Sequence, residues 1–330
     1  MKNFIKYFAA GACALSMASC LDLSPKDQLS DPDLWDKPGD FESFANKFYD
    51  WMPNFDRTYG DWHADKSSDL LLDKGATNVL SNGTNTIPQS DGDYTGSYDH
   101  IRRCNLLIEK AAGYSNQDEI RQSLGEAYFW RAWNHFTLVQ KFGDAIIVDK
   151  TIDVDDPRMN AKRNDRGEVV NFIIEDLNKA VSLMKSTSEI DEGRVGKEGA
   201  QAFLSRVALY EGTWQKFRGN EERGKSLCDI AAKAAKAVMN SGKFELFAPV
   251  TLGDSAQKYM FILEDVQCNP AGLNKSANKE YILKRCYHAT LKTTGKNLTT
   301  EVLANAQYVA AKFVDMYLCS DGLPIDKSPL

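Results

Sequence analysis

Apolar side chains recur every three or four residues through the middle of the chain, which is the spacing of one face of an α-helix. Ile101, Cys104 and Ile108 begin this series, and Gly113 follows where a C-terminal cap belongs. Similar stripes predict four further helices, over residues 116–141, 170–184, 203–214 and 227–238. Because short connections favour antiparallel neighbours, we expect these helices to pack as hairpins.

A run of such hairpins predicts a mostly α fold with stacking of the tetratricopeptide kind. Ala132 and Phe136 match one small-then-large element of that repeat. The rest of the consensus is absent, and the intervals between the helices vary. We therefore predict divergent tetratricopeptide-like helical hairpins with long irregular loops.

The pattern is less regular on either side of these helices. Residues 40–51 place three phenylalanines and a tryptophan at helical spacing, which predicts a short helix. Residues 56–98 lose the periodicity and fill with Gly, Asn, Asp, Ser and Thr, so we expect a long loop there. Beyond residue 244 the sequence predicts only a short β-like piece at 280–285 and a helix over about 300–318.

The first twenty residues have the features of a bacterial export signal. Lys2 and Lys6 give a positive start, residues 7–18 are small or apolar, and Cys20 closes the stretch. Spanning a bilayer takes about 20 apolar residues, so this shorter run predicts a cleaved signal peptide over residues 1–19. The ending resembles a lipobox, which predicts lipid attachment at Cys20, each buried methylene contributing roughly 0.8 kcal/mol. The alternative is an ordinary secretory signal in which this cysteine is incidental.

Composition supports a soluble folded part after the anchor. Residues 20–38 are rich in Asp, Ser and Pro and are expected to form a lipidated tether, followed by a helical domain over 39–330. The chain of 330 residues is 43% hydrophobic and 26% charged, as in ordinary globular proteins. Its net charge of -6, without clustered Lys and Arg, excludes nucleic acid as a partner.

Five cysteines lie beyond the signal and its lipidated residue, and they form an odd set without a CxxC pair. Neither a disulfide scaffold nor a zinc site is predicted from such spacing. We expect most of them to be buried thiols, while a bridge between Cys268 and Cys286 stays open.

The second of the five predicted middle helices carries a broad aromatic stripe made of Phe129, Trp133 and Phe136. Such a stripe more often fills a core than forms a binding site. Arg131 and Arg206 lie inside otherwise apolar helical stretches, so we expect each to pair with an acidic or carbonyl partner.

Several separated stretches resemble the SusD/RagB family of outer-membrane nutrient-binding lipoproteins of Bacteroidetes. The long aromatic helix from Glu126 to Asp144 is the most recognisable of them. The others match in the same order as in the family and occupy residues 20–25, 29–31, 175–180 and 194–212.

The resemblance implies a surface-exposed, lipid-anchored protein of the outer membrane that binds oligosaccharides. It also implies delivery of the ligand to a TonB-dependent, SusC-like transporter, with no catalytic activity and no cofactor. One departure is that residues 313–325 resemble a segment that lies well before the end of family members. The chain is therefore expected to lack part of the usual C-terminal region, either as a short member or as a truncated reading frame.

Sugar binding needs flat aromatic faces and polar groups for hydroxyls, and such side chains are usually presented on loops. The irregular region 56–98 supplies both kinds, and family members commonly contact ligand from this side of the helices. We therefore expect Trp62, Asn85 and Tyr94 to contact the ligand. For any one of the aromatic residues, local packing is the competing interpretation.

The hypotheses of an enzyme or a metal site have less support in the sequence than the hypothesis of a sugar-binding protein. The sequence has no GxSxG, HExxH, Walker or strand-linked GxGxxG motif. His135 lies on the aromatic helix, where a core or hydrogen-bonded role is expected. Asp91 and Asp93 could begin a calcium loop, but the later oxygen ligands are missing, so no metal is predicted.

The alternative function is a helical-repeat scaffold that binds protein and has no sugar site.

Overall fold

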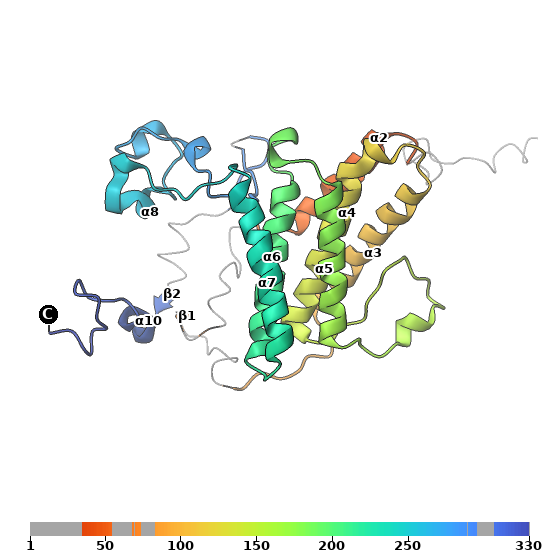
Figure 1. The fold of residues 1–330 in the computed structure, drawn as a ribbon, viewed down its shortest axis with the longest axis horizontal. Helices are drawn as coiled ribbons and strands as arrows, with labels where there is room; N and C mark the ends of the chain where they lie inside the picture. The colour runs from red at the N-terminus through yellow and green to blue at the C-terminus, as the bar shows by residue number, and fades with distance from the viewer. Residues whose placement is uncertain are drawn as a thin grey trace, which may run out of the picture.

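The computed structural model describes residues 35–54, 68, 70–73, 83–288, 290–295 and 307–329. Its central feature is an array of five long helices that follow one another along the chain (Figure 1). They are α3 (Gly92–Ala112), α4 (Gln117–Phe142), α5 (Arg166–Leu183), α6 (Lys197–Lys216) and α7 (Glu221–Asn240). Each of them packs against the next one in sequence, so the mostly α, tetratricopeptide-like architecture is confirmed.

Shorter elements flank this array. Before it lie α2 (Pro38–Asn46), the 3-10 helix η3 (Lys47–Trp51) and β1 (Leu71–Asp73). Within it lie η5 (Pro157–Asn160) and η6 (Thr187–Glu189), and after it η7 (Val250–Ser255), α8 (Ala256–Tyr259), η8 (Val266–Cys268), η9 (Lys275–Ala277), β2 (Gln307–Val309) and α10 (Ala311–Asp315). The two strands pair antiparallel, with Leu71 opposite Val309.

The predicted helix ends agree with the structure at several glycines and differ at one helix start. Gly143 and Gly242 follow α4 and α7 with φ of 77° and 64°, the left-handed backbone that favours glycine after a helix. Helix α3 begins at Gly92, although the sequence pattern predicted irregular chain up to residue 98. The helix starts early because the Asp91 side chain accepts hydrogen bonds from the backbone N–H groups of Asp93 and Tyr94.

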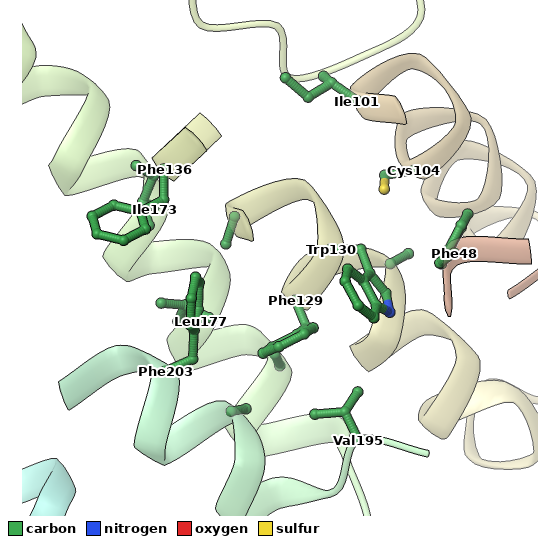
Figure 2. Close-up of a cluster of buried hydrophobic side chains, with 14 of the residues drawn as sticks. Phe48, Ile101, Cys104, Phe129, Trp130, Phe136, Ile173, Leu177, Val195 and Phe203 are labelled. Carbon is green, nitrogen blue, oxygen red and sulfur yellow. The ribbon is translucent and has the colours of Figure 1, made fainter. Parts of the chain in front are cut away.

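The core lies between the helices and is rich in aromatic rings (Figure 2). Trp130 is fully buried on α4, and Phe48 and Ile101 bring η3 and α3 onto the same cluster. The predicted packing role of the aromatic stripe on α4 is confirmed. Trp133 stacks on Phe203 of α6 with ring centroids 4.7 Å apart and an interplanar angle of 14°.

Buried ion pairs join the helices through this core. Arg131 of α4 donates to Asp176 of α5, with Nε 2.7 Å from Oδ2, and both side chains are buried. Burial raises the pKa of the Asp176 carboxyl, although the guanidinium acts against this shift. The predicted pairing of Arg131 is thus confirmed. The same expectation was wrong for Arg206, which lies on the exposed side of α6.

Two glycines bring α6 and α7 close together. A Cβ atom at Gly212 would lie 2.9 Å from the sulfur of Cys228, and one at Gly224 would lie 2.9 Å from the Gly212 carbonyl oxygen. Either substitution would therefore force the hairpin apart.

The chain after α7 packs differently from the array. Residues 244–283 form a small lobe with its own core of Phe247, Leu252, Ala256 and Leu263 (Figure 1). The predicted β-like piece at 280–285 is not a strand in the structure. In place of the predicted helix over 300–318, the described residues contain β2 and the short α10.

The cysteine prediction was largely wrong. Only Cys104 is buried among the five described cysteines, whereas Cys268 and Cys286 are exposed and free. Cys228 and Cys319 are partly exposed. Burial raises the pKa of the Cys104 thiol.

Candidate functional site

The described part of the expected ligand region is a corner where the start of α3 meets the end of α4. Asp93 of the first turn of α3 forms an ion pair with Lys141 of the last turn of α4. Tyr94 lies beside it, with its ring centroid 5.2 Å from Phe142 and 5.0 Å from Tyr98. Tyr94 is therefore a partly buried helix residue, and not the loop residue that the sequence predicted.

Tyr98 connects this corner to the segment that follows α4. Its hydroxyl donates to the carbonyl oxygen of Ile146 at 3.2 Å and accepts from the N–H of the same residue at 2.9 Å. Burial raises the pKa of the Tyr98 hydroxyl, so it stays protonated and can make both bonds. The Tyr98 side chain thus satisfies both backbone hydrogen-bonding groups of Ile146, as a neighbouring β-strand would.

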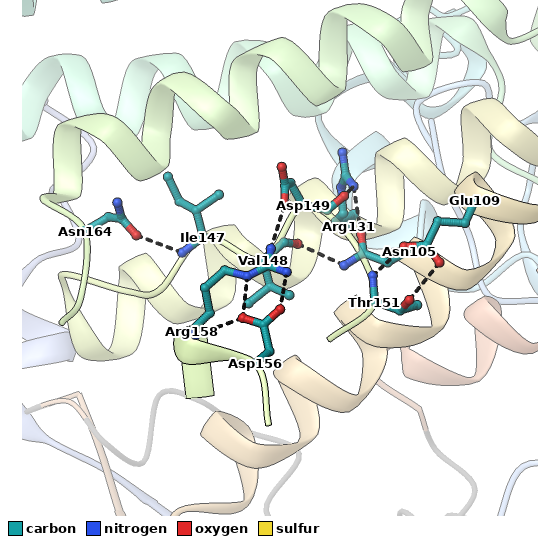
Figure 3. Close-up of polar contacts among 10 residues, drawn as sticks. All are labelled: Asn105, Glu109, Arg131, Ile147, Val148, Asp149, Thr151, Asp156, Arg158 and Asn164. Atoms are coloured by element: carbon teal, nitrogen blue, oxygen red, sulfur yellow. Dashed lines mark hydrogen bonds and ion pairs between the residues drawn. The ribbon is translucent and has the colours of Figure 1, made fainter. Parts of the chain in front are cut away.

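The connection between α4 and α5, residues 143–165, is held by further side chains from the helices (Figure 3). Asn105 of α3 donates to the Val148 carbonyl oxygen at 3.0 Å. Arg131 donates to the Asp149 carbonyl oxygen at 2.8 Å and also to the side-chain oxygen of Asn105 at 2.7 Å. The guanidinium that bonds Asp176 therefore also fixes this loop.

The outer part of the connection has its own bonds (Figure 3). Glu109 accepts from the backbone N–H of Thr151 at 2.6 Å and from its hydroxyl at 2.7 Å. Arg158 makes a two-pronged contact with Asp156 and reaches Asp149 at 2.9 Å. The hydrogen bonds from Arg158 lower the pKa of the Asp156 carboxyl. The result is a loop surface whose backbone is positioned in advance, as binding loops on rigid scaffolds are.

The other expected site residues are placed less completely. Asn85 lies exposed in the irregular stretch before α3, and in the described part of the chain its side chain makes no hydrogen bond. Trp62 and the predicted lipidation residue Cys20 lie outside the described residues. The structure thus places Tyr94 in a packed corner and shows no contact between it and Asn85.

Asp91 and Asp93 are both used for local structure, as a helix cap and as the partner of Lys141. Within the described ranges, no three His, Cys, Asp or Glu side chains come together in a group that could hold a metal ion. His135 has the expected core role, since it is fully buried with Nδ1 2.9 Å from the Arg131 carbonyl oxygen.

The residues that hold the connection were not identified from the sequence. Asn105 and Glu109 lie next to the predicted apolar stripe of α3, and a polar side chain beside such a stripe was the one available signal. The backbone partners of Asn105 and Glu109 lie more than 40 positions away in the sequence, and no local pattern can indicate them.

No helix among the described residues is long and apolar enough to cross a membrane.

Comparison with known proteins places this chain in a wider group. Residues 27–209 match the SusD-like family described as "Starch-binding associating with outer membrane". The SusD-like protein P2 of Formosa agariphila is 26% identical over 250 residues, which cover 70% of this chain and 46% of that protein.

Solved structures share the fold at lower identity. A SusD-like carbohydrate binding protein from Bacteroides fragilis aligns with a TM-score of 0.68 and 18% identity, covering 89% of this chain and 56% of its own. A second SusD-like protein from the same species aligns with a TM-score of 0.61 and 22% identity, over 81% of this chain and 48% of its own.

The chain spans about half the length of these relatives. The family match covers more than half of the chain, including α2 to α5 and the corner at Tyr94. This chain belongs to the SusD-like family of outer-membrane-associated binding proteins.

Proposed function

We propose that this protein binds oligosaccharides at a bacterial outer membrane and passes them to a TonB-dependent, SusC-like transporter. The observation that carries the proposal is the match of residues 27–209 to a family described as starch-binding and associated with that membrane. The carbohydrate-binding relative of similar fold supports the same ligand class. In this proposal the protein acts by binding and not by catalysis.

The proposed arrangement has three parts. The signal peptide over residues 1–19 is removed, Cys20 carries lipid, and residues 20–38 link this anchor to the helical domain over 39–330. Anchoring keeps the binding surface near the transporter, so the effective ligand concentration there rises without any new contact.

The ligand surface is proposed to include Trp62, Asn85 and Tyr94. Asn85 is exposed and has amide donors and an acceptor for sugar hydroxyls. Tyr94 is held in one orientation by Tyr98 and Phe142, and a fixed ring loses little freedom when a sugar stacks on it.

Binding of the purified protein to a polysaccharide panel, followed by calorimetry on the best oligosaccharide, tests this function. The Trp62→Ala, Tyr94→Ala double variant should weaken binding by roughly five- to 150-fold, since stacking rings contribute about 0.5–1.5 kcal/mol each. The control is Tyr281→Ala, because this ring is 45% exposed at the end of the lobe and is not part of the corner at Tyr94. A folded double variant with unchanged affinity would contradict the assigned residues, and absence of binding to every glycan would favour the protein-binding scaffold.

A further inference from the structure

A second polar surface lies at the other end of the hairpins, around the connection between α5 and α6. This connection, residues 184–196, borders a cavity of about 480 Å³, within the size range of small-ligand sites. Side chains of α4, α6 and α7 complete its lining, among them Arg121, Gln201 and Ser241. Most of the lining residues are polar or charged.

Two lysines are brought together at this cavity by the backbone. The N–H of Lys197, the first residue of α6, donates to the carbonyl oxygen of Lys185 at 2.8 Å. Both side chains belong to exposed residues that line the cavity. The side chains of both lysines therefore line the same cavity.

These cations have no acidic partner in the part of the chain that the structure describes. No carboxylate lies within ion-pair distance of Lys185 or Lys197, and Arg121 bonds only to the Leu183 carbonyl oxygen, at 2.7 Å from Nε. The N-terminal end of the α6 dipole adds a partial positive charge beside the lysines.

Both carboxylates of the cavity accept hydrogen bonds from the connection itself. Glu198 is buried and accepts from the Ser186 hydroxyl at 2.7 Å and from the Thr187 N–H and hydroxyl at 2.8 and 3.0 Å. These bonds outweigh burial and lower the pKa of Glu198. Glu189 accepts from the Ser186 N–H at 3.0 Å. The acceptor capacity of Glu198 is thus directed into the protein, whereas Glu189 is exposed and uses one carboxylate oxygen in its bond to Ser186. The lysine and arginine donors remain available.

The connection that borders the cavity is fixed at both ends. Gln122 of α4 accepts from the Lys185 N–H at 2.9 Å and donates to the Val195 carbonyl oxygen at 3.0 Å. Arg194 forms a buried ion pair with Glu126, with Nη2 2.6 Å from Oε2. Little ordering of this backbone would be needed on binding.

The hollow continues beyond the two lysines. A neighbouring cavity of about 180 Å³ shares Lys185 and Glu189 with it, and a third of about 370 Å³ shares Glu42, Asp191 and Arg194 with the second. We call these three adjoining cavities the groove. Because the second and third are also lined by carboxylates, among them Glu42, Glu119 and Asp191, only the first offers a place for an anionic group, beside the two lysines.

We propose that this groove binds an acidic oligosaccharide, with a carboxylate or sulfate of the sugar against Lys185 and Lys197 and its hydroxyls against Gln201 and Ser241. The inference rests on the proposed oligosaccharide-binding function and names the ligand class. The groove is also a binding surface separate from the corner at Tyr94. That corner lies at the start of α3 and the end of α4, whereas the groove lies beside the start of α4.

The test measures affinity of the purified protein for three probes: trigalacturonic acid, a sulfated carrageenan tetrasaccharide and maltotriose. The Lys185→Gln, Lys197→Gln variant should lose at least tenfold in affinity for an acidic probe, and its weak binding should no longer depend on salt. Maltotriose binding should not change. The matched control is Lys225→Gln, Lys233→Gln, which removes two exposed lysines from α7 outside the groove.

Each outcome separates the two proposals. Preference for the carboxylate or for the sulfate probe identifies which anion the groove takes. Equal affinity of the wild type and the groove variant for acidic probes, with unchanged unfolding temperature, would overturn the groove and leave oligosaccharide binding intact. Tighter binding of maltotriose than of both acidic probes would do the same. Failure to bind any glycan, including a wider polysaccharide panel, would overturn both.

Discussion

The helical array and the small lobe that follows it bury apolar side chains to very different extents. The array from α3 to α7, with α2 packed against it, encloses a continuous core with fully buried Trp130, Phe129 and Leu177, whereas the lobe 244–283 buries only four apolar side chains. The lobe also leaves large apolar residues in solvent, including Val250 at 97% and Phe261 at 65% exposure. Since stability grows with apolar area removed from water, the array should unfold as one unit and the lobe should open separately.

The largest expected effect is on the array. Replacing Arg131 by Ala leaves Asp176 buried without its partner and frees the loop at Asp149, so the free energy of unfolding should fall by about 3–5 kcal/mol. Urea unfolding followed by circular dichroism measures this loss. Lys179→Ala is the control, because Lys179 is half-exposed and reaches Asp176 only at 3.9 Å, so it should cost less than about 1 kcal/mol. Equal effects of the two variants would show that the buried pair is not what secures the array.

A smaller and local effect is expected in the lobe. Leu263 is 2% exposed, so Leu263→Ala should destabilise the lobe by about 2–3 kcal/mol through lost burial and a cavity. Hydrogen exchange should become faster over residues 244–283 and stay unchanged in α3 to α6. A matching fall in the unfolding temperature of the helices would mean that the two regions form one cooperative unit.

The third effect depends on pH and belongs to the array alone. Burial lowers the pKa of His135 to about 3, so the folded protein keeps this ring neutral while the unfolded chain protonates it near its ordinary value of about 6.5. Stability is therefore complete above pH 6.5 and is lost as the pH falls toward 3. The loss should reach about 2 kcal/mol at pH 5.

Chemical unfolding at pH 7 and pH 5 measures this difference. A His135→Asn variant should lose less stability between the two values than the wild type, and exchange within the lobe should respond equally in both proteins. An identical pH dependence of array unfolding in the two proteins would show that His135 is not the group responsible.

The contrast between the regions also explains how far the sequence could be interpreted. The array was predictable because α3, α5, α6 and α7 each bury one face, and burial of one face imposes helical spacing on apolar residues. The central helix α4 is buried nearly all round, and its aromatic run identified it instead. The lobe buries too few side chains to impose any period, so its short helices and the absence of a strand at 280–285 had no local signal.

The candidate site shows a different limit. Tyr94 was expected on a loop because its neighbours are Gly, Asp and Thr, yet Asp91 starts a helix that includes them all. Arg131 and Arg206 look alike in sequence, but the register of α6 turns the second of them to solvent. The neighbouring positions of Lys185 and Lys197 depend on a backbone hydrogen bond between residues 12 positions apart, which only the folded chain reveals.

The bonds of Arg131 also have a consequence for the order of folding. Its guanidinium reaches partners 45, 26 and 18 positions away, on α5, on α3 and in the connection after α4. Contacts at such separations form only after the intervening chain has paid its loop-closure entropy. We therefore expect the connection 143–165 to gain its fixed shape late, once α3, α4 and α5 have docked, so that this loop surface exists only on a chain that has completed its helical assembly.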